Sequence, residues 1–108
     1  MRITITARHC EIPDELRLRA RTLLERLRKV ATRPHDAQVL FSEDHSAPTV
    51  EVRLHTARGV VHVGTADGTD HRSALDRAAA KVRRQLGKAA PKRRRMAAAR
   101  RALERQPR

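Results

Sequence analysis

Two alternating segments joined by a short turn constrain the fold of this chain most strongly. Apolar and polar residues alternate over residues 49–56, where Val50, Val52 and Leu54 share one side, and they alternate again over residues 60–66. This period of two is typical of strands that bury one face. Because Arg58-Gly59 between them suits a tight turn, the pattern predicts an antiparallel hairpin.

The turn also predicts the register of this hairpin. A two-residue turn at 58–59 sets Leu54 opposite Val63 and Val52 opposite Thr65. The apolar sets of both strands then face the same side of the sheet. We therefore expect Val63 to point into the core.

Four further segments complete the predicted architecture. Residues 1–7 and 37–43 read as strands, the first by alternation and the second by its β-branched and aromatic content. A helix begins near Pro13, in its first turn, and continues to about Ala31 with apolar residues on one face. A second helix follows the loop at residues 67–70 and ends near Gly87 or Pro91.

These elements predict an α+β fold of order β-α-β-β-β-α. Three consecutive strands with short turns form an antiparallel meander, and each helix has one apolar stripe, so both helices cover one face of a four-stranded sheet. A length of 108 residues suits one small domain. We place this domain at residues 1–90 and expect the basic tail at residues 91–108 to be disordered when free.

The charge of the chain points to a polyanionic partner. Lys and Arg number 25 against 12 Asp and Glu, which gives a formal net charge of +13 at pH 7. Phe41 is the only aromatic residue among Phe, Trp and Tyr, so base stacking on such side chains has little part to play. We infer that the partner is nucleic acid, held mainly through its phosphate backbone.

The cations are grouped along the sequence. On the second helix, four of them recur at intervals of four, three and four, with no acid in the stripe: Arg77, Lys81, Arg84 and Lys88. This spacing is predicted to place them opposite the apolar face. The first helix has a looser set on the two sides of its apolar face, with Arg17, Arg21 and Arg28 on one side and Arg19 and Arg26 on the other. If the two helices lie side by side, their basic rows form one positive surface. The tail adds Lys92, Arg93, Arg94 and Arg95, which could settle on RNA.

Other kinds of site find little support in the sequence. Cys10 is the only cysteine, which excludes an internal disulfide and a cysteine-rich zinc site. In the predicted register His55 and His62 are neighbours on the exposed sheet face, but no third metal ligand is evident. Phosphate loops, nucleophile elbows and paired carboxylates are absent as motifs. We predict a protein that is not an enzyme, with no cofactor, metal or small-molecule substrate.

No segment has the roughly 18 apolar residues of a membrane span, and residues 1–6 do not read as the start of a signal peptide. These observations predict a cytoplasmic protein without a membrane partner.

Several motifs resemble the ribosome hibernation promoting factor and ribosome-associated inhibitor family, also called sigma-54 modulation proteins. The matching residues are Ile3-Thr4-Ile5-Thr6, Leu16-Arg17, Arg26-Leu27, Asp70, Ala74-Leu75-Asp76, Lys81-Val82, Arg84-Gln85-Leu86 and Lys88. The resemblance covers about residues 1–92. Because the chain ends soon after the second helix, it resembles the short form of the family.

The resemblance implies a fold like that of double-stranded-RNA-binding domains and a bacterial stress and stationary-phase function. Proteins of this kind lie in the decoding channel of the small ribosomal subunit, contact 16S ribosomal RNA and exclude messenger and transfer RNA. Carried over by position, the RNA-facing residues within the resemblance are Arg17, Arg26, Lys81, Arg84, Gln85, Lys88 and Lys92. We expect a monomer when the protein is free.

Two other functions stay open at this point. One is a protein-binding modulator of transcription, which predicts an apolar patch on the open sheet face. The other is a general double-stranded RNA or nucleoid-binding protein, which the charge alone would allow.

Overall fold

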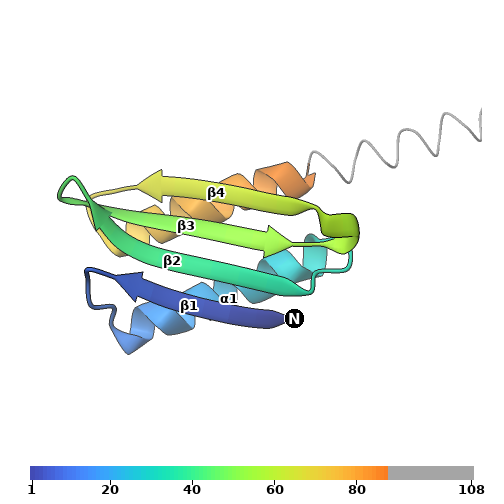
Figure 1. Cartoon of the computed structure of the whole chain (residues 1–108), viewed down its shortest axis with the longest axis horizontal. Helices are drawn as coiled ribbons and strands as arrows, with labels where there is room; N and C mark the ends of the chain where they lie inside the picture. Colours follow the sequence, from blue (N-terminus) through green and yellow to red (C-terminus); the bar gives the residue numbers. More distant parts are fainter. Residues whose placement is uncertain (88–108) are drawn as a thin grey trace, which may run out of the picture.

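Four strands form one mixed sheet in the computed structural model, which describes residues 1–87 (Figure 1). The strands are β1 (Arg2–Arg8), β2 (Asp36–Asp44), β3 (Ala47–His55) and β4 (Val61–Asp67), and their order in the sheet follows the sequence. β1 runs parallel to β2, whereas β2, β3 and β4 pair antiparallel. The predicted meander is therefore confirmed.

Both helices cover the same face of this sheet, as predicted. α1 (Asp14–Val30) lies behind β1 and β2, and a second helix at residues 71–87, orange in Figure 1, lies behind β3 and β4. Both helices begin at the same end of the sheet and run in the same direction. The element order β-α-β-β-β-α is confirmed. The predicted domain boundary at residue 90 and the tail lie outside the described residues.

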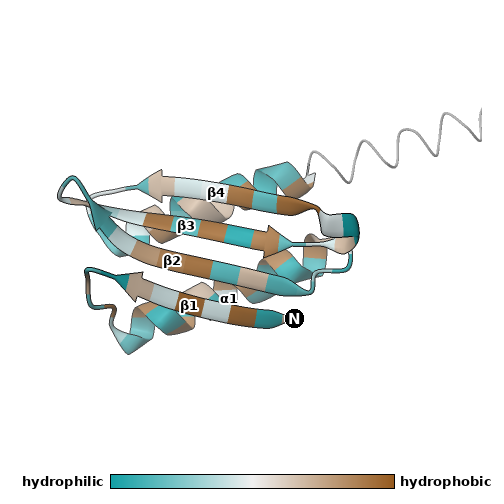
Figure 2. Ribbon diagram, viewed as in Figure 1, coloured by the Kyte–Doolittle hydropathy of each residue, from teal (hydrophilic) through white to brown (hydrophobic). Residues whose placement is uncertain are grey.

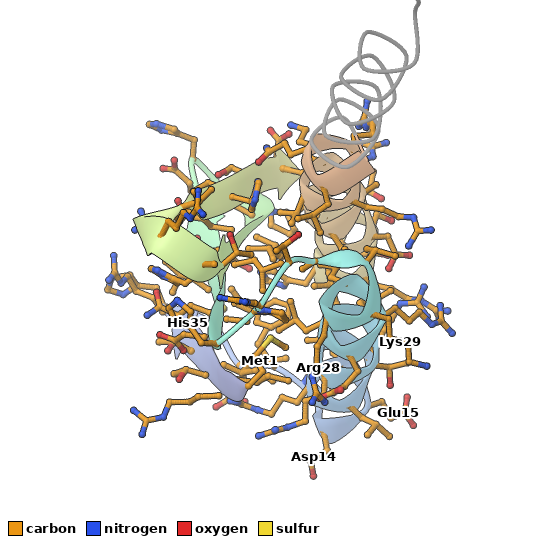
Figure 3. The ribbon with its side chains drawn as sticks, turned by 90° about the vertical axis from the view of Figure 1, so that its right-hand side faces the viewer. Met1, Asp14, Glu15, Arg28, Lys29 and His35 are labelled. Atoms are coloured by element: carbon orange, nitrogen blue, oxygen red, sulfur yellow. The ribbon has the colours of Figure 1, made fainter. Side chains whose placement is uncertain are left out.

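The charges at the two ends of α1 suit the direction of the helix. Pro13 occupies the N-cap position, and Asp14 and Glu15 stand in the first turn, where carboxylates interact favourably with the positive end of the helix dipole. Arg28 and Lys29 stand in the last turn, where cations are favoured. Figure 3 shows these four side chains on the helical layer.

Aliphatic side chains fill the space between the sheet and the helices. Phe41 on β2 is the one aromatic among them and is fully buried. The other large, fully buried side chains of the core are Leu24, Val39, Val50, Val52, Leu54, Leu75 and Val82. The apolar bands along the strands in Figure 2 follow this arrangement. A core of this kind is stabilised by packing alone, because the chain can form no internal disulfide.

The predicted register between β3 and β4 is wrong by one residue. Leu54 pairs with His62, and Arg53 pairs with Val63. The turn itself is confirmed, since Arg58 and Gly59 both have positive φ and Val60 donates its N–H to the Ala57 oxygen. However, His55 pairs with Val61. A two-residue turn at 58–59 would instead have paired His55 with His62. A shift of one residue turns every side chain of β4 to the other face.

The packing of the second helix explains this register. Gly64 faces the helix so closely that a Cβ atom there would overlap the carbonyl oxygen of Ala78. The same atom would lie 3.1 Å from the Cβ of Lys81 and 3.1 Å from a methyl carbon of Val82. In the predicted register the bulkier Val63 would have to occupy this inward-facing side. Only the observed register places a residue without a side chain there.

The corrected register changes the open face of the sheet. Val61 and Val63 lie on it with 42% and 38% of their surface exposed. His62 turns to the helical side, so it is not the exposed neighbour of His55, and this predicted pair is wrong. Within residues 1–87, no group of three His, Cys, Asp or Glu side chains gathers in a way that could hold a metal ion.

Gly64→Ala is expected to lower the free energy of unfolding by roughly 1–3 kcal/mol, because the added methyl group overpacks the contact with the second helix. The matched control is Gly87→Ala. Gly87 has open space around its Cα, and alanine favours helix. Urea unfolding of both variants measures the difference. Equal stability of the two variants would contradict the close approach at Gly64.

Candidate nucleic-acid interface

Positive charge is concentrated in the helical layer. α1 carries six Lys and Arg against three Asp and Glu, and the helix at residues 71–87 carries five against one. The four strands carry three against five. Figure 3 shows the two layers side by side, with basic side chains extending from the outer surface of the helices. The helical layer is therefore the surface suited to phosphate groups.

An ion pair joins the two helices. Arg19 of α1 donates from Nε to Oδ1 of Asp76 and from Nη2 to Oδ2, both at 2.9 Å. The side chains are 36% and 42% exposed. These hydrogen bonds raise the pKa of Arg19, although its partial desolvation opposes this effect. A bidentate pair fixes orientation as well as distance, so it holds the helices in register with each other.

A shallow groove of about 310 Å³ runs between the helices beside this pair. Its floor is mainly apolar. The residues that line it are Arg19, Leu23, Arg26, Leu27, Asp76, Ala79, Ala80 and Arg83. Asp76 is bound to Arg19, and neither Arg26 nor Arg83 makes an ion pair among the described residues. Two guanidinium groups at this groove are therefore not neutralised by an acid.

Arg83 was missed by the sequence reasoning, which considered only the stripe on the other flank of the second helix. The signal was present, because residues 76, 79, 80 and 83 follow one another at helical spacing and so share a flank. Asp76 is the acidic residue on this flank, and it pairs with Arg19 of α1.

Part of the predicted stripe on the second helix lies in a different place than expected. Arg77 and Lys81 border the free edge of β4 instead of lying opposite the apolar face. Three side chains of the helix donate to successive outward-facing carbonyl groups of β4: Arg77 Nη1 to Asp67 O at 3.3 Å, Lys81 Nζ to Thr65 O at 2.6 Å, and Gln85 Nε2 to Val63 O at 2.7 Å. Because carbonyl groups on an edge strand can recruit another chain, these contacts protect the edge.

The spacing of these contacts follows from helix and strand geometry. Four residues of a helix advance by about 6.0 Å, and two residues of an antiparallel strand advance by about 6.8 Å. A series at i, i+4 and i+8 on the helix therefore matches alternate carbonyl groups of the strand. Long side chains at residues 77, 81 and 85 absorb the small mismatch.

The residues predicted to contact RNA are distributed over several parts of the helical layer. Arg26 lies at the groove, and Arg84 is exposed on the second helix without an ion pair among the described residues. Arg17 is half-buried on α1 and is not among the groove residues. Lys81 and Gln85 cover the β4 edge. Outside the described residues lie Lys88, Lys92, Arg93, Arg94 and Arg95.

Two polar groups fix the start of the second helix. His71 Nε2 lies 2.9 Å from the Ser42 oxygen, and its ring meets Phe41 edge-on with the centroids 6.0 Å apart. Asp70 Oδ1 accepts a hydrogen bond of 2.7 Å from the N–H of Ser73, as an N-cap residue does. This hydrogen bond lowers the pKa of Asp70, with smaller contributions from Arg72 and His71.

The N-cap predicts a dependence of stability on acid. Because the folded-state pKa of Asp70 is below its unfolded value of about 3.9, its contribution is present at neutral pH and is lost as pH falls through the folded pKa. The melting temperature of wild type should exceed that of Asp70→Asn at pH 6, and the gap should close toward pH 2. Thermal melts across this range, with Asp67→Asn as the control, measure it. A gap that stays constant with pH would contradict the charged cap.

The family of the chain follows from its sequence and agrees with its fold. The profile of the family described as Sigma 54 modulation protein / S30EA ribosomal protein matches residues 3–94. The chain therefore belongs to this family, as its motifs indicated. A search of curated proteins gave no match.

Two solved structures share the fold. The first, a ribosomal subunit interface protein from Coxiella burnetii, has a TM-score of 0.73 at 20% identity, and the match covers 84% of this chain and 99% of that one. The second, the N-terminal domain of Thermus thermophilus Protein Y, has a TM-score of 0.70 at 23% identity, with 82% and 98% covered. These similarities confirm the α+β architecture. Within residues 1–87, no helix has the length and hydrophobicity needed to cross a membrane.

Proposed function

We propose that this protein is a ribosome-associated translation inhibitor. It binds 16S ribosomal RNA in the decoding channel of the small subunit, in the cytoplasm, and excludes messenger and transfer RNA by occupying their space. Membership of the Sigma 54 modulation protein / S30EA ribosomal protein family supports an association with the ribosome. The similarity to a ribosomal subunit interface protein agrees with it.

The distribution of charge between the two layers is the structural observation that supports the proposal. The helical layer has eleven Lys and Arg against four Asp and Glu, whereas the strands have an excess of acid. A protein that coated nucleic acid from all sides would need no such difference between its faces. One basic face suits a partner that presents phosphate groups on one side.

The proposed mechanism requires no catalytic step. The folded domain fills space, and the cations of the helical layer hold it against ribosomal RNA. The Arg19–Asp76 pair joins the two helices, and the hydrogen bonds to β4 hold the second helix against the sheet, so little conformational freedom is given up on binding. Inhibition then depends on occupancy, and it ends when the protein dissociates.

Competition on isolated small subunits tests this mechanism. We expect the protein to displace a short messenger RNA and initiator transfer RNA, each labelled, in a filter-binding assay. The displacement should saturate at one protein per subunit. A general double-stranded RNA-binding protein would instead bind in several copies and leave both ligands in place, and this result would refute the proposal.

Reversal of charge at Arg26 and Arg84 tests the proposed face. Replacing both with Glu should weaken binding to small subunits strongly, because each reversal removes an attraction and adds a repulsion to phosphate. Stability should change by only about 0.5 kcal/mol per site, as is usual for exposed side chains. Co-sedimentation with small subunits measures binding.

The matched control reverses two arginines on the open sheet face, Arg8→Glu with Arg53→Glu. Both double variants reduce the formal charge by four. Equal loss of binding in the two variants would mean that net charge alone governs affinity, and the helical face would then have no special role.

A second candidate function has one observation in its favour. A protein-binding modulator of transcription needs an apolar contact surface, and Val60, Val61 and Val63 expose 38–44% of their surface on or beside β4. Val61 and Val63 of this valine patch lie on the open sheet face, where the predicted register had placed His62 instead. This function predicts that the protein binds purified sigma-54. The double variant Val61→Thr with Val63→Thr should abolish this binding, and Arg26→Glu should keep it.

A further inference from the structure

Two loops meet at one end of the sheet, and we refer to this region, residues 31–35 and 56–60, as the loop end. Ala57 donates its N–H to the Thr32 oxygen at 3.4 Å, and His35 donates its N–H to the His55 oxygen at 3.1 Å. The His35 ring adds a contact of 3.0 Å between its Nε2 and the Thr56 oxygen. The backbones of the two loops are therefore joined at several points.

An arginine occupies a left-handed backbone position in each loop. Arg33 has φ of 48° and Arg58 has φ of 64°. This conformation costs a residue with a side chain roughly 1–2 kcal/mol, and Gly or Asn usually occupies it. His9, His45 and Ser46 share the conformation at the opposite end of the sheet, so positive φ alone does not distinguish the loop end.

The charge of the side chains does distinguish it. Arg33 and Arg58 are both exposed, each directly follows a residue of the Thr32–Ala57 hydrogen bond, and neither makes an ion pair among the described residues. The two joined loops therefore carry two guanidinium groups that no described carboxylate neutralises. Strained backbone positions of this kind gather at functional sites, and two unpaired cations suit an anionic ligand.

The ends of the molecule differ in charge. Figure 1 shows that α1 ends at the loop end, where β2 begins and β3 finishes, while both helices start at the opposite end. The cations of the loop end and its surroundings are Arg2, Arg28, Lys29, Arg33 and Arg58, and they outnumber its carboxylates, Asp36 and Glu25, the second of which pairs with Arg28. The carboxylates of the opposite end are Glu11, Asp14, Glu15, Glu43, Asp44, Asp67 and Asp70, and they outnumber its cations, Arg8, Arg17 and Arg72. An RNA backbone is therefore attracted to the loop end and repelled from the other.

We propose that Arg33 and Arg58 form a second phosphate-binding site, which contacts the ribosomal RNA backbone independently of the helical layer. This inference rests on the proposed function for the identity of the RNA. It adds the orientation of the bound molecule, because the loop end faces RNA and the acidic end faces away.

Substitution by asparagine removes the charge of these arginines and keeps their backbone conformation. Arg33→Asn with Arg58→Asn removes both charges, and asparagine tolerates positive φ. In the second loop the substitution creates an Asn-Gly pair with Gly59, which is a favoured hairpin dipeptide. The full-length variant should melt at or above the temperature of wild type. Its affinity for small subunits should fall about tenfold, and the slope of log affinity against log salt should flatten by roughly 0.7–0.9 for each phosphate that is no longer neutralised.

Two further variants make the result specific. Arg33→Lys with Arg58→Lys keeps both charges and should retain most of the salt dependence. Arg8→Gln with Arg53→Gln removes the same charge from the open sheet face and should leave the slope almost unchanged. An equal effect of the Asn and Gln variants, or an unchanged slope in the Asn variant, would overturn the proposed site.

A parallel titration separates this inference from the proposed function. If wild type does not bind small subunits, the proposed function fails. Binding of the same variants to a double-stranded RNA of about 20 base pairs then decides on the second site, since the phosphate chemistry is shared. A slope on this duplex that does not respond to the Asn variant refutes it.

Discussion

The close approach of the second helix to β4 is the contact on which the rest of the structure depends. At Gly64 the strand passes so near to Ala78 that no side chain fits between them. This contact selects the register of β4 and thereby which of its residues reach the core. It also brings the flank with Arg77 and Lys81 to the sheet edge and leaves the Asp76 flank directed to α1. The positions of the cations on the second helix thus follow from one glycine.

Edge protection and charge are combined in the same side chains. Donors at residues 77, 81 and 85 cover outward-facing carbonyl groups of β4, yet the first two also add positive charge to the helical layer. A lysine that is already hydrogen-bonded has given up part of its rotamer freedom on folding. It therefore loses less on binding a phosphate, provided that the ammonium group keeps a donor directed outward. Under the proposed function, stability and binding are coupled at residues 77 and 81, whereas no such hydrogen bond holds Arg84 among the described residues.

The sequence predicted the element order, the meander and the side of the sheet that the helices cover, because these depend on periodicity and on short connections. It failed at the β3–β4 register, since a loop of two or three residues is compatible with the same Arg58-Gly59 turn. Gly64 held the missing information, as an isolated glycine in a strand often marks a close backbone approach. Arg83 was missed for a related reason. The flank that a cation occupies depends on the neighbouring helix, which periodicity within one helix does not reveal.

The direction of the helices connects the fold to the charge distribution. Because both helices run the same way, their dipoles add, with partial positive charge at the starts and partial negative charge at the ends. Carboxylates at both starts and cations at the end of α1 stabilise the helices locally. The same placement gives the whole domain an acidic end and a basic end. A polyanionic surface then favours one orientation of the domain over its reverse, so helix stability and directed binding require the same arrangement of charge.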